Sequence, residues 1–304
     1  MMNIVNSFID YQGKLNKSKR TLDSYKDECR LFVERYVQKH EDFKKLENTD
    51  FLINTWLVDM MEQYAPQTVN KKKIALSTFS NYLVMQNIIS ENKIKQVEKV
   101  ENDVKKIDIY TDEEEEKMLS YLENKIKENK FQRKIDREVF IMQRCIIHLL
   151  MTSAMRISEV IKMKIEDINL DKTNTFSIRG KGYNNKVSRK NSFNEIVAKE
   201  LREYLEIRRR IQIAEGDEEF LFVSPLSKKH ITEKSVRKFV KKMQDDLGIT
   251  GTIHEFRHTK CSKLIEKGVD VEKVALYAGH ANSNTTKRYY IKSTESELEE
   301  MANL

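Results

Sequence analysis

Residues 254–258 of the chain, HEFRH, match the HExxH signature, in which two histidines one helical turn apart bind zinc. Gly251 and Thr252 come just before this segment, so the histidines fall in the first turn of a predicted helix, and no GxxH continuation follows. A helix N-terminus presents free backbone N–H groups to an anion, and the Arg257 guanidinium matches two phosphate oxygens. The segment therefore favours an anion site over a zinc site, and we expect no bound metal.

A second arginine, Arg156, stands at another expected helix start, in TSAMRISEV at residues 152–160. Ile157 and Val160 would hold this helix in the core while the Arg156 side chain leaves on a different face. Glu159 lies three residues further on and can brace the guanidinium. Considered alone, the two residues could equally form an ordinary surface ion pair, which is common on helices.

A lysine between two glycines lies in a predicted β-hairpin, TFSIRGKGYNNKVSRKNSF at residues 175–193. The glycines allow a tight turn, from which Lys181 can project toward a groove or simply be solvated. The tripeptide lacks the GxxxxGKS/T pattern, so it does not indicate a nucleotide-binding P-loop. The long turn leaves Lys186 as an alternative to Lys181 for the lysine that reaches a ligand.

Two adjacent tyrosines follow a glycine-histidine pair in AGHANSNTTKRYYIK at residues 278–292. A tyrosine hydroxyl has a pKa near ~10 and needs neighbouring positive charge or a base before it can attack an electrophile. Lys287 and Arg288 come directly before Tyr289 and Tyr290 and supply such charge. As an isolated feature, however, the tyrosines could be plain core aromatics.

The order and spacing of these four segments resemble the catalytic set of the tyrosine recombinase (phage integrase) family, in particular its small Xer-like members. The boxes MRISEV, RGKG, HEFRHT and GHANSNTTKRYY occur in the family's order, and the resemblance covers about residues 110–290. The family's nucleophile falls nine residues after the histidine of the GH pair, which selects Tyr289 over Tyr290. The sequence departs from the pattern at Ala154, where glycine is common, and at Asn191-Ser192, where proline is common. The resemblance implies six catalytic residues: Arg156, Lys181, His254, Arg257, His280 and Tyr289.

This resemblance implies a site-specific DNA recombinase that acts in integration, excision or resolution without metal or cofactor. Tyr289 would attack a DNA phosphodiester and form a 3′-phosphotyrosyl bond, which conserves bond energy for rejoining. Arg156 and Arg257 would stabilise the charge that develops on the non-bridging oxygens.

Other side chains would move protons or orient the reacting groups. Lys181 would protonate the leaving 5′-oxygen, His254 would handle the tyrosine proton, and His280 would hydrogen-bond the phosphate. Glu159 and His258 would orient these groups.

Enzymes of this kind act on double-stranded DNA with inverted half-sites, as a homotetramer or with a related recombinase, through a Holliday junction. Two other functions remain open: DNA relaxation in the manner of a type IB topoisomerase, and DNA binding without catalysis by a regulator. All six reacting positions are filled, which weighs against the regulator. Products from supercoiled plasmids with and without a cognate site would separate the three functions.

Composition fits a DNA-binding protein of the cytoplasm. The net charge is +7 and the pI is near 9.0, a balance that attracts polyanions. No apolar run approaches the ~18 residues of a membrane span, and the N-terminus lacks the pattern of a signal peptide. We therefore expect no membrane partner. Cys29, Cys145 and Cys261 are scattered and predict neither a disulfide framework nor a metal knuckle, which favours a reducing compartment.

The elements that must position these residues fall into two predicted domains of a mostly α-helical chain. With 304 residues the chain has room for about two domains, and only two prolines and eight glycines interrupt it. Residues 1–105 predict a helical core-binding, DNA-binding domain. Residues 106–304 predict a mixed but mainly helical catalytic domain with a small β-hairpin or sheet. The linker near residues 100–110 could span ~33 Å, enough to cross a DNA groove ~12 Å wide.

Apolar periodicity predicts which helical faces are buried. In the first domain one such face comprises Leu22, Tyr25, Cys29, Phe32 and Tyr36. A second helix begins at Pro66, with an inward face of Ile74, Phe79, Tyr82 and Leu83. Residues 71–73, KKK, could line a DNA groove, although a basic triplet is more often solvated. In the second domain residues 139–151 predict a buried central helix that contains His148 as a core histidine.

The C-terminal residues 293–304 predict a short amphipathic tail helix. Thr294 and Glu297 make a capping box, and an apolar stripe comprises Leu298, Met301 and Leu304. A free helix of this length is marginal in water. The stripe is therefore expected to dock in a groove, either of its own domain or of a neighbouring protomer. Since the helical part begins almost at Met1, an additional arm-site DNA-binding domain is not expected.

Overall fold

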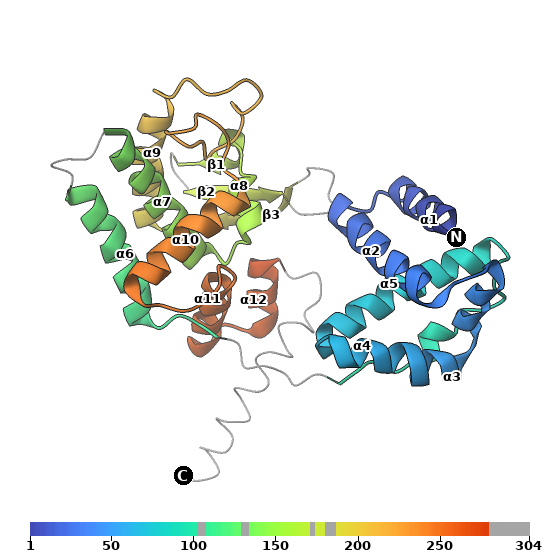
Figure 1. Ribbon diagram of the computed structural model, residues 1–304. Helices are drawn as coiled ribbons and strands as arrows, with labels where there is room; N and C mark the ends of the chain where they lie inside the picture. Colours follow the sequence, from blue (N-terminus) through green and yellow to red (C-terminus); the bar gives the residue numbers. More distant parts are fainter. Residues whose placement is uncertain (102–107, 129–133, 171–173, 180–186, 280–304) are drawn as a thin grey trace, which may run out of the picture. The chain divides into compact units, whose positions relative to one another are not determined.

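The computed structural model describes residues 1–101, 108–128, 134–170, 174–179 and 187–279 of the chain. The chain divides into two compact units, Met1–Lys105 and Lys106–Leu304. Most of the described residues are helical, and a small antiparallel sheet lies in the second unit (Figure 1), which confirms the predicted fold class. No helix in these ranges is long and apolar enough to cross a membrane.

The first unit is a bundle of helices around an aromatic core. Its α-helices are α1 (Met2–Lys14), α2 (Lys19–Tyr36), α3 (Thr49–Phe51), α4 (Val58–Gln63) and α5 (Pro66–Met85). A π-helical stretch, η2 (Leu52–Leu57), joins α3 to α4, and two 3-10 helices complete the unit, η1 (His40–Glu47) and η3 (Lys93–Gln96). The ring of Phe8 lies 5.2 Å from that of Phe79 and 5.6 Å from that of Tyr82, so α1 and α5 share one core.

The predicted buried faces are correct for α2 and partly wrong for α5. Cys29, Phe32 and Tyr36 are at most 8% exposed, which confirms the stripe on α2. On α5, Phe79 is fully buried, but Ile74 is 58% exposed. The inward stripe passes through residues that follow the helical repeat, Val69, Leu76, Phe79 and Leu83. Ile74 lies two residues from Leu76, about 200° around the helix, and therefore faces away from the core.

The basic triplet of α5 is engaged within the unit rather than solvated as a group. Lys72 Nζ lies 2.5 Å from Glu28 Oε2 and 4.2 Å from the centre of the Tyr64 ring. Lys73 Nζ donates to the carbonyl of Val97. Lys71 is the exposed member of the three. Two of the three lysines are thus held by intramolecular contacts, which differs from the solvated face that a basic triplet favours.

The second unit surrounds a central helix with further helices and a sheet. Its α-helices are α6 (Asp112–Lys127), α7 (Lys134–Ser153), α8 (Ile157–Ile161), α9 (Glu195–Arg208), α10 (Glu233–Leu247), α11 (Glu255–Glu266) and α12 (Val271–Ala278). The antiparallel sheet has the order β1 (Ile168–Asn169), β2 (Thr175–Arg179), β3 (Val187–Ser192), preceded by the 3-10 helix η4 (Ile165–Asp167). In the register of β2 and β3, Ile178 lies opposite Arg189.

Helix α7 is the buried centre of this unit, as predicted. It packs against α6, α9 and α11, and its apolar residues from Ile141 to Met151 are almost fully buried. The His148 side chain is 16% exposed, and its Nδ1 lies 2.7 Å from Glu200 Oε2, which confirms a histidine within the fold. At the start of α6 the Thr111 hydroxyl accepts a hydrogen bond from the backbone N–H of Glu114, which makes the predicted cap.

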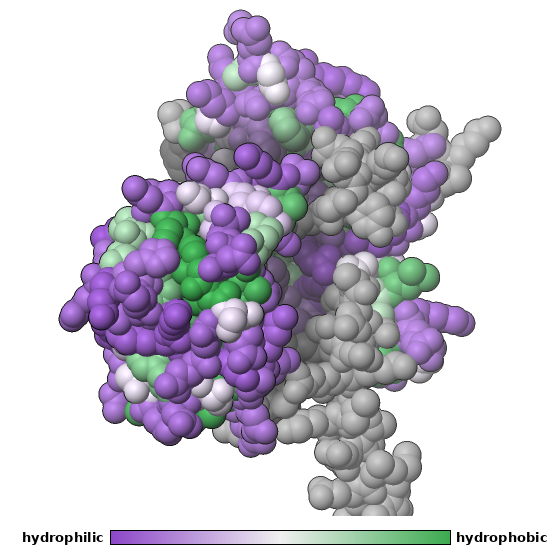
Figure 2. Space-filling view, turned by 90° about the vertical axis from the view of Figure 1, so that its right-hand side faces the viewer, coloured by the Kyte–Doolittle hydropathy of each residue, from purple (hydrophilic) through white to green (hydrophobic). Residues whose placement is uncertain are grey.

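Helix α12 rests on a small apolar cluster that is separate from the main core. Its buried members are Ala154, Cys261, Val274 and Ala278. The three cysteines of the chain are buried. On the side shown in Figure 2 the coloured surface is mainly hydrophilic and carries a hydrophobic patch.

Candidate active site

The first predicted site residue, Arg156, is the N-cap of α8 and is braced by Glu159. Its backbone N–H donates to Glu159 Oε2 at 2.8 Å, and its Nη1 donates to Glu159 Oε1 at 3.0 Å. The Arg156 side chain is 36% exposed, whereas the Glu159 side chain is only 7% exposed. The carboxylate therefore lies underneath the guanidinium, and part of the guanidinium faces outward. This is the arrangement that an arginine needs to meet an external anion.

A further arginine, Arg189 on β3, binds the same carboxylate. Its Nη1 lies 3.2 Å from Glu159 Oε1 and its Nη2 lies 3.0 Å from Glu159 Oε2, in a two-pronged ion pair. The Arg189 side chain is 10% exposed. Sequence reasoning missed this residue. Residues opposite each other in an antiparallel pair share a face, so the pairing of Arg189 with the buried Ile178 was the signal that places it inward.

Glu159 is held as a charged carboxylate. Burial acts to raise its pKa, but the hydrogen bonds and positive charge of Arg189, together with those of Arg156, outweigh burial and lower the pKa below its usual value. Two guanidiniums thus face one carboxylate, and the cluster keeps a net positive charge.

Arg257 lies in the first turn of α11 and is 5% exposed. Its Nη1 donates to the carbonyl of Ala154 at 2.7 Å, while its Nη2 is buried and makes no hydrogen bond within the described part of the chain. Burial, together with the nearby charge of Arg156, lowers the pKa of Arg257 to about 10. A buried cation normally has an anionic partner. The geometry therefore leaves one N–H of Arg257 available to an anion that none of the described residues supplies.

His254 is the N-cap residue of α11, with helical backbone angles of φ −74° and ψ −21°. Burial and the charges of Arg237 and Arg257 lower its pKa below the ordinary value. The pKa of His258, one turn further on, is lowered by burial and by His254. Both imidazoles are therefore neutral at pH 7 and can accept a proton. Among the residues that the structure describes, no group of three His, Cys, Asp or Glu side chains is arranged to hold a metal ion.

The loop before α11 is fixed by Tyr110, which sequence reasoning also missed. The Tyr110 hydroxyl donates to the carbonyl of Thr252 at 2.9 Å and accepts from Gln244 Nε2 at 2.8 Å. Its backbone N–H donates to Thr259 Oγ1 at 2.8 Å. Gly251 has φ +150°, and a Cβ there would lie 2.8 Å from the Tyr110 ring, so this glycine allows the close approach. Tyr110 thereby sets where α11 begins, and with it the places of His254 and Arg257.

Two residues with left-handed backbone conformation, Ala154 and Gly279, accept hydrogen bonds from the site arginines. Ala154, whose carbonyl receives Arg257, has φ +52° at a position where a side chain is strained. Gly279, the C-cap of α12, has φ +70°, and its carbonyl accepts from Arg156 Nη2 at 3.2 Å. A Cβ at Gly279 would collide with the guanidinium of Arg189. Glycine is therefore required at Gly279, whereas at Ala154 the chain tolerates the strain.

The structure brings together Arg156, His254 and Arg257 of the six predicted site residues, since their charges act on one another. The other three, Lys181, His280 and Tyr289, lie outside the described residues, as do Lys186, Tyr290 and the tail at residues 293–304.

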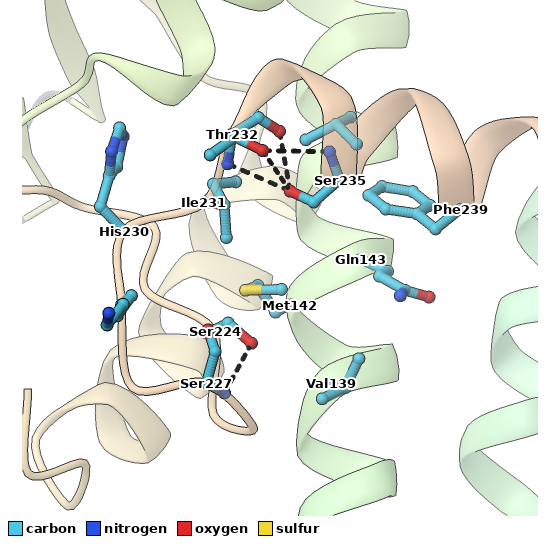
Figure 3. Close-up of a pocket in the computed structure, with 12 residues that line it drawn as sticks. Val139, Met142, Gln143, Ser224, Ser227, His230, Ile231, Thr232, Ser235 and Phe239 are labelled. Atoms are coloured by element: carbon cyan, nitrogen blue, oxygen red, sulfur yellow. Dashed lines mark hydrogen bonds between the residues drawn. The ribbon is translucent and has the colours of Figure 1, made fainter.

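A cavity of about 340 Å³ lies elsewhere in the second unit and contains none of the site residues. Val139 and Met142 of α7, the loop residue Ser224, and Ser235 and Phe239 of α10 are among its lining side chains (Figure 3). The site arginines instead lie around the start of α8 and of α11 and the C-terminus of α12. An arrangement at helix ends suits a large anionic substrate better than a small enclosed ligand.

Several known proteins are similar to this chain in sequence or in fold. The sequence model of the Phage integrase family matches residues 110–297. Tyrosine recombinase XerC of Leptospira interrogans is 25% identical over 293 residues, which cover 95% of this chain and 88% of the relative. The TnP I resolvase of Bacillus thuringiensis is 26% identical over 302 residues, which cover 95% of each chain.

Solved structures agree with the family match. The XerH site-specific recombinase bound to palindromic difH substrate has a TM-score of 0.72 at 20% identity, covering 100% of this chain and 95% of that chain. The Tn1549 transposon integrase in complex with transposon right end DNA has a TM-score of 0.72 at 17% identity, covering 99% of each chain. Since the family match spans more than half of the sequence, the chain belongs to the Phage integrase family of tyrosine recombinases.

Proposed function

We propose that this recombinase breaks and rejoins DNA strands with Tyr289 as its nucleophile. Membership of the family makes the chain an enzyme of site-specific DNA recombination. The observation that carries the proposed chemistry is the buried guanidinium of Arg257, whose Nη2 makes no hydrogen bond within the described residues. A phosphodiester oxygen is a partner of the right charge and geometry for that N–H group.

In the proposed reaction the Tyr289 oxygen attacks phosphorus, and the bond from phosphorus to the 5′-oxygen breaks. The products are a 3′-phosphotyrosyl bond and a free 5′-hydroxyl. A 5′-hydroxyl of the partner strand then attacks the same phosphorus, which joins the strands, breaks the phosphotyrosyl bond and frees Tyr289. Arg156 and Arg257 stabilise the charge on the non-bridging oxygens throughout. Lys181 gives a proton to the leaving 5′-oxygen, and His254 takes the proton of the tyrosine.

The lowered pKa of His254 supports its part in this scheme. A base must be neutral before it accepts a proton, and burial beside Arg237 and Arg257 disfavours the protonated imidazole. His280 then completes the phosphate contacts, next to Gly279, whose carbonyl already binds Arg156. No step in this scheme uses a metal ion or an organic cofactor.

The DNA partner we propose is a duplex with two inverted half-sites. Relatives have been solved with a palindromic difH substrate and as a lambda integrase dimer bound to a core site. We propose that residues 1–105 bind DNA as the core-binding domain, and that four protomers, or this chain with a related recombinase, exchange strands through a Holliday junction. The net charge of +7 fits such a partner, and the scattered, buried cysteines fit the cytoplasm.

The test is covalent trapping on a nicked duplex. A footprint selection with the full chain on genomic fragments first supplies the site, and a nick beside the scissile phosphate then lets the 5′-hydroxyl leave. Tyr289→Phe is expected to bind this duplex but form no adduct, whereas Tyr290→Phe, the matched control, is expected to form it. An adduct that survives in Tyr289→Phe and vanishes in Tyr290→Phe would reverse the assignment.

A second measurement separates recombination from the two other activities. Supercoiled plasmids with and without the selected site are incubated with the chain in excess chelator. Site-dependent products indicate recombination, relaxation of both plasmids indicates a topoisomerase, and binding without adduct indicates a regulator. If the chain bound a metal ion stoichiometrically, and if removal of that ion by the chelator also removed the activity, the metal-free scheme would be contradicted.

A further inference from the structure

The carboxylate of Glu159 is shared between two arginines in an unequal way. Arg189 engages both of its oxygens, at 3.2 Å and 3.0 Å. The Arg156 side chain makes a single hydrogen bond to it, from Nη1 at 3.0 Å, and a backbone N–H makes the other contact. The Nη2 of Arg156 turns instead to the carbonyl of Gly279 at 3.2 Å. The buried Arg189 thus binds both carboxylate oxygens through its side chain, whereas the more exposed Arg156 binds only one of them through its side chain.

This sharing has an electrostatic consequence for Arg156. A carboxylate bound by both prongs of one arginine neutralises that arginine, and the pair carries no net charge. With Arg189 present, one carboxylate faces two guanidiniums, so the cluster keeps one positive charge. Without Arg189, Glu159 could rotate to pair with Arg156 by both oxygens. The charge that Arg156 offers to a phosphate would then be cancelled inside the protein.

Arg189 has a side chain that is enclosed by its surroundings and held in one place. It lies on β3 opposite Ile178, its side chain is 10% exposed, and its Nε is buried without a hydrogen bond among the described residues. Its guanidinium also lies so close to Gly279 that a Cβ there would collide with it. A buried ion pair of this kind is weak support for stability alone, because desolvation offsets most of the attraction. Its geometry instead connects β3, α8 and the end of α12 at the site.

We propose that Arg189 is a positioning residue for strand cleavage: it holds both oxygens of Glu159 and so prevents that carboxylate from neutralising Arg156. The inference rests on the proposed function of Arg156 at the scissile phosphate. Arg189 acts through Glu159 and needs no contact with DNA of its own. Its loss therefore lowers the rate of cleavage at saturating DNA rather than the affinity for DNA.

The test is a double-mutant cycle on the full chain, with the nicked duplex as probe. The variants are Arg189→Met, Glu159→Gln and the double variant, with Arg202→Met as the matched control. Arg202 is in the same unit and is paired with Glu195 at 3.3 Å, and its hydrogen bonds reach none of the site residues. The single-turnover rate of adduct formation, the DNA affinity and the melting temperature are measured for each.

We expect Arg189→Met to slow adduct formation by about 10- to 100-fold, a loss typical of misplaced catalytic groups, with DNA affinity changed less than about twofold. In the Glu159→Gln background, where no carboxylate charge remains to neutralise Arg156, the same substitution is expected to slow the reaction by less than about threefold. Arg189→Lys keeps a cation against Glu159 and is expected to recover most of the rate. Arg202→Met is expected to react like the original chain.

Equal slowing by Arg189→Met in both backgrounds would overturn the proposal, because Arg189 would then act independently of Glu159. An unchanged rate in Arg189→Met would overturn it as well. If Arg189→Met does not fold, the cycle is made with Arg189→Gln instead, and equal slowing in both backgrounds again overturns the proposal. Failure of the original chain to form any Tyr289 adduct would instead count against the proposed function.

Discussion

Two arginines of the second unit are buried to a similar degree and have opposite surroundings. Arg144 on α7 is 8% exposed, and Arg257 on α11 is 5% exposed. Arg144 contacts three carboxylates, those of Glu123, Glu200 and Glu203. Among the described residues, the Arg257 guanidinium hydrogen-bonds to a backbone carbonyl and to no carboxylate. Burial by itself therefore does not distinguish a structural arginine from a binding one, whereas the presence or absence of a carboxylate does.

The pKa values of the two arginines move in opposite directions for this reason. Burial acts to lower both values. At Arg144 the charges of its three glutamates outweigh burial and raise the pKa. At Arg257 burial is joined by the positive charge of Arg156, and the pKa falls to about 10. The charge of Arg144 is thus balanced by carboxylates of the protein. The charge of Arg257 has no carboxylate partner among the described residues.

The largest expected effect on folding is that of Arg144→Met. The substitution leaves the carboxylate of Glu200, whose side chain is 7% exposed, without its cation. Breaking a buried pair in this way costs about 3–5 kcal/mol in the free energy of unfolding, which urea denaturation measures. The rate of adduct formation per folded molecule is expected to stay unchanged. A slowed reaction in fully folded protein would show that Arg144 also serves the site.

Arg257→Met is expected to do the opposite of Arg144→Met: it should slow the reaction and leave the stability nearly unchanged. Removing a group that stabilises charge in the transition state lowers the rate about 10²–10³-fold, measured as single-turnover cleavage of the nicked duplex. The free energy of unfolding is expected to change by no more than about 1 kcal/mol, because the substitution removes a buried charge together with one hydrogen bond. A loss of stability as large as that of Arg144→Met would remove the distinction between the two arginines.

A smaller effect is expected at Ala154, which presents its carbonyl to Arg257 from a left-handed backbone with φ +52°. Ala154→Gly relieves a strain of about 1–2 kcal/mol, part of which the greater freedom of glycine in the unfolded chain offsets. We expect the melting temperature of the second unit to rise by about 2 °C. Ala198→Gly, within the regular helix α9, is the control and should lower it.

The smallest effect is a change in pH dependence around His254. Its pKa lies below the ordinary value of 6.5, so the neutral base persists as the pH falls to 6.5 and is lost only at lower pH. The rate of adduct formation is therefore expected to fall with a midpoint below pH 6.5, the pKa of an ordinary histidine. Removing a nearby positive charge by Arg237→Met should raise the pKa and move this fall to higher pH. Lys241→Met, on the same helix but paired with Asp245, should not move it.

Much of the fold follows from local pattern in the sequence. The α2 stripe, the proline at the first turn of α5 and the Thr111 cap of α6 depend on residues close together in the chain. The placing of Arg156 and Arg257 at helix starts could be predicted for the same reason. Glu159 as a brace also follows from a spacing of three residues.

The rest depends on contacts between distant segments. Arg189 reaches Glu159 across 30 positions, and only the strand register opposite Ile178 directs it inward. Lys72 is engaged because Glu28, from α2, faces it. Tyr110 fills space that exists only because Gly251, 141 positions later in the chain, lacks a side chain.

The small apolar cluster beneath α12 has a consequence for how this part of the enzyme opens. Helix α12 is eight residues long, and its buried side chains are a valine and two alanines. Such a helix loses little apolar contact when it separates, so its local opening costs far less than unfolding of α7. Its amide hydrogens should therefore exchange with deuterium well before those of α7. The Gly279 carbonyl, which accepts from Arg156, can then leave the site and return by opening of a single helix, while the main core stays folded.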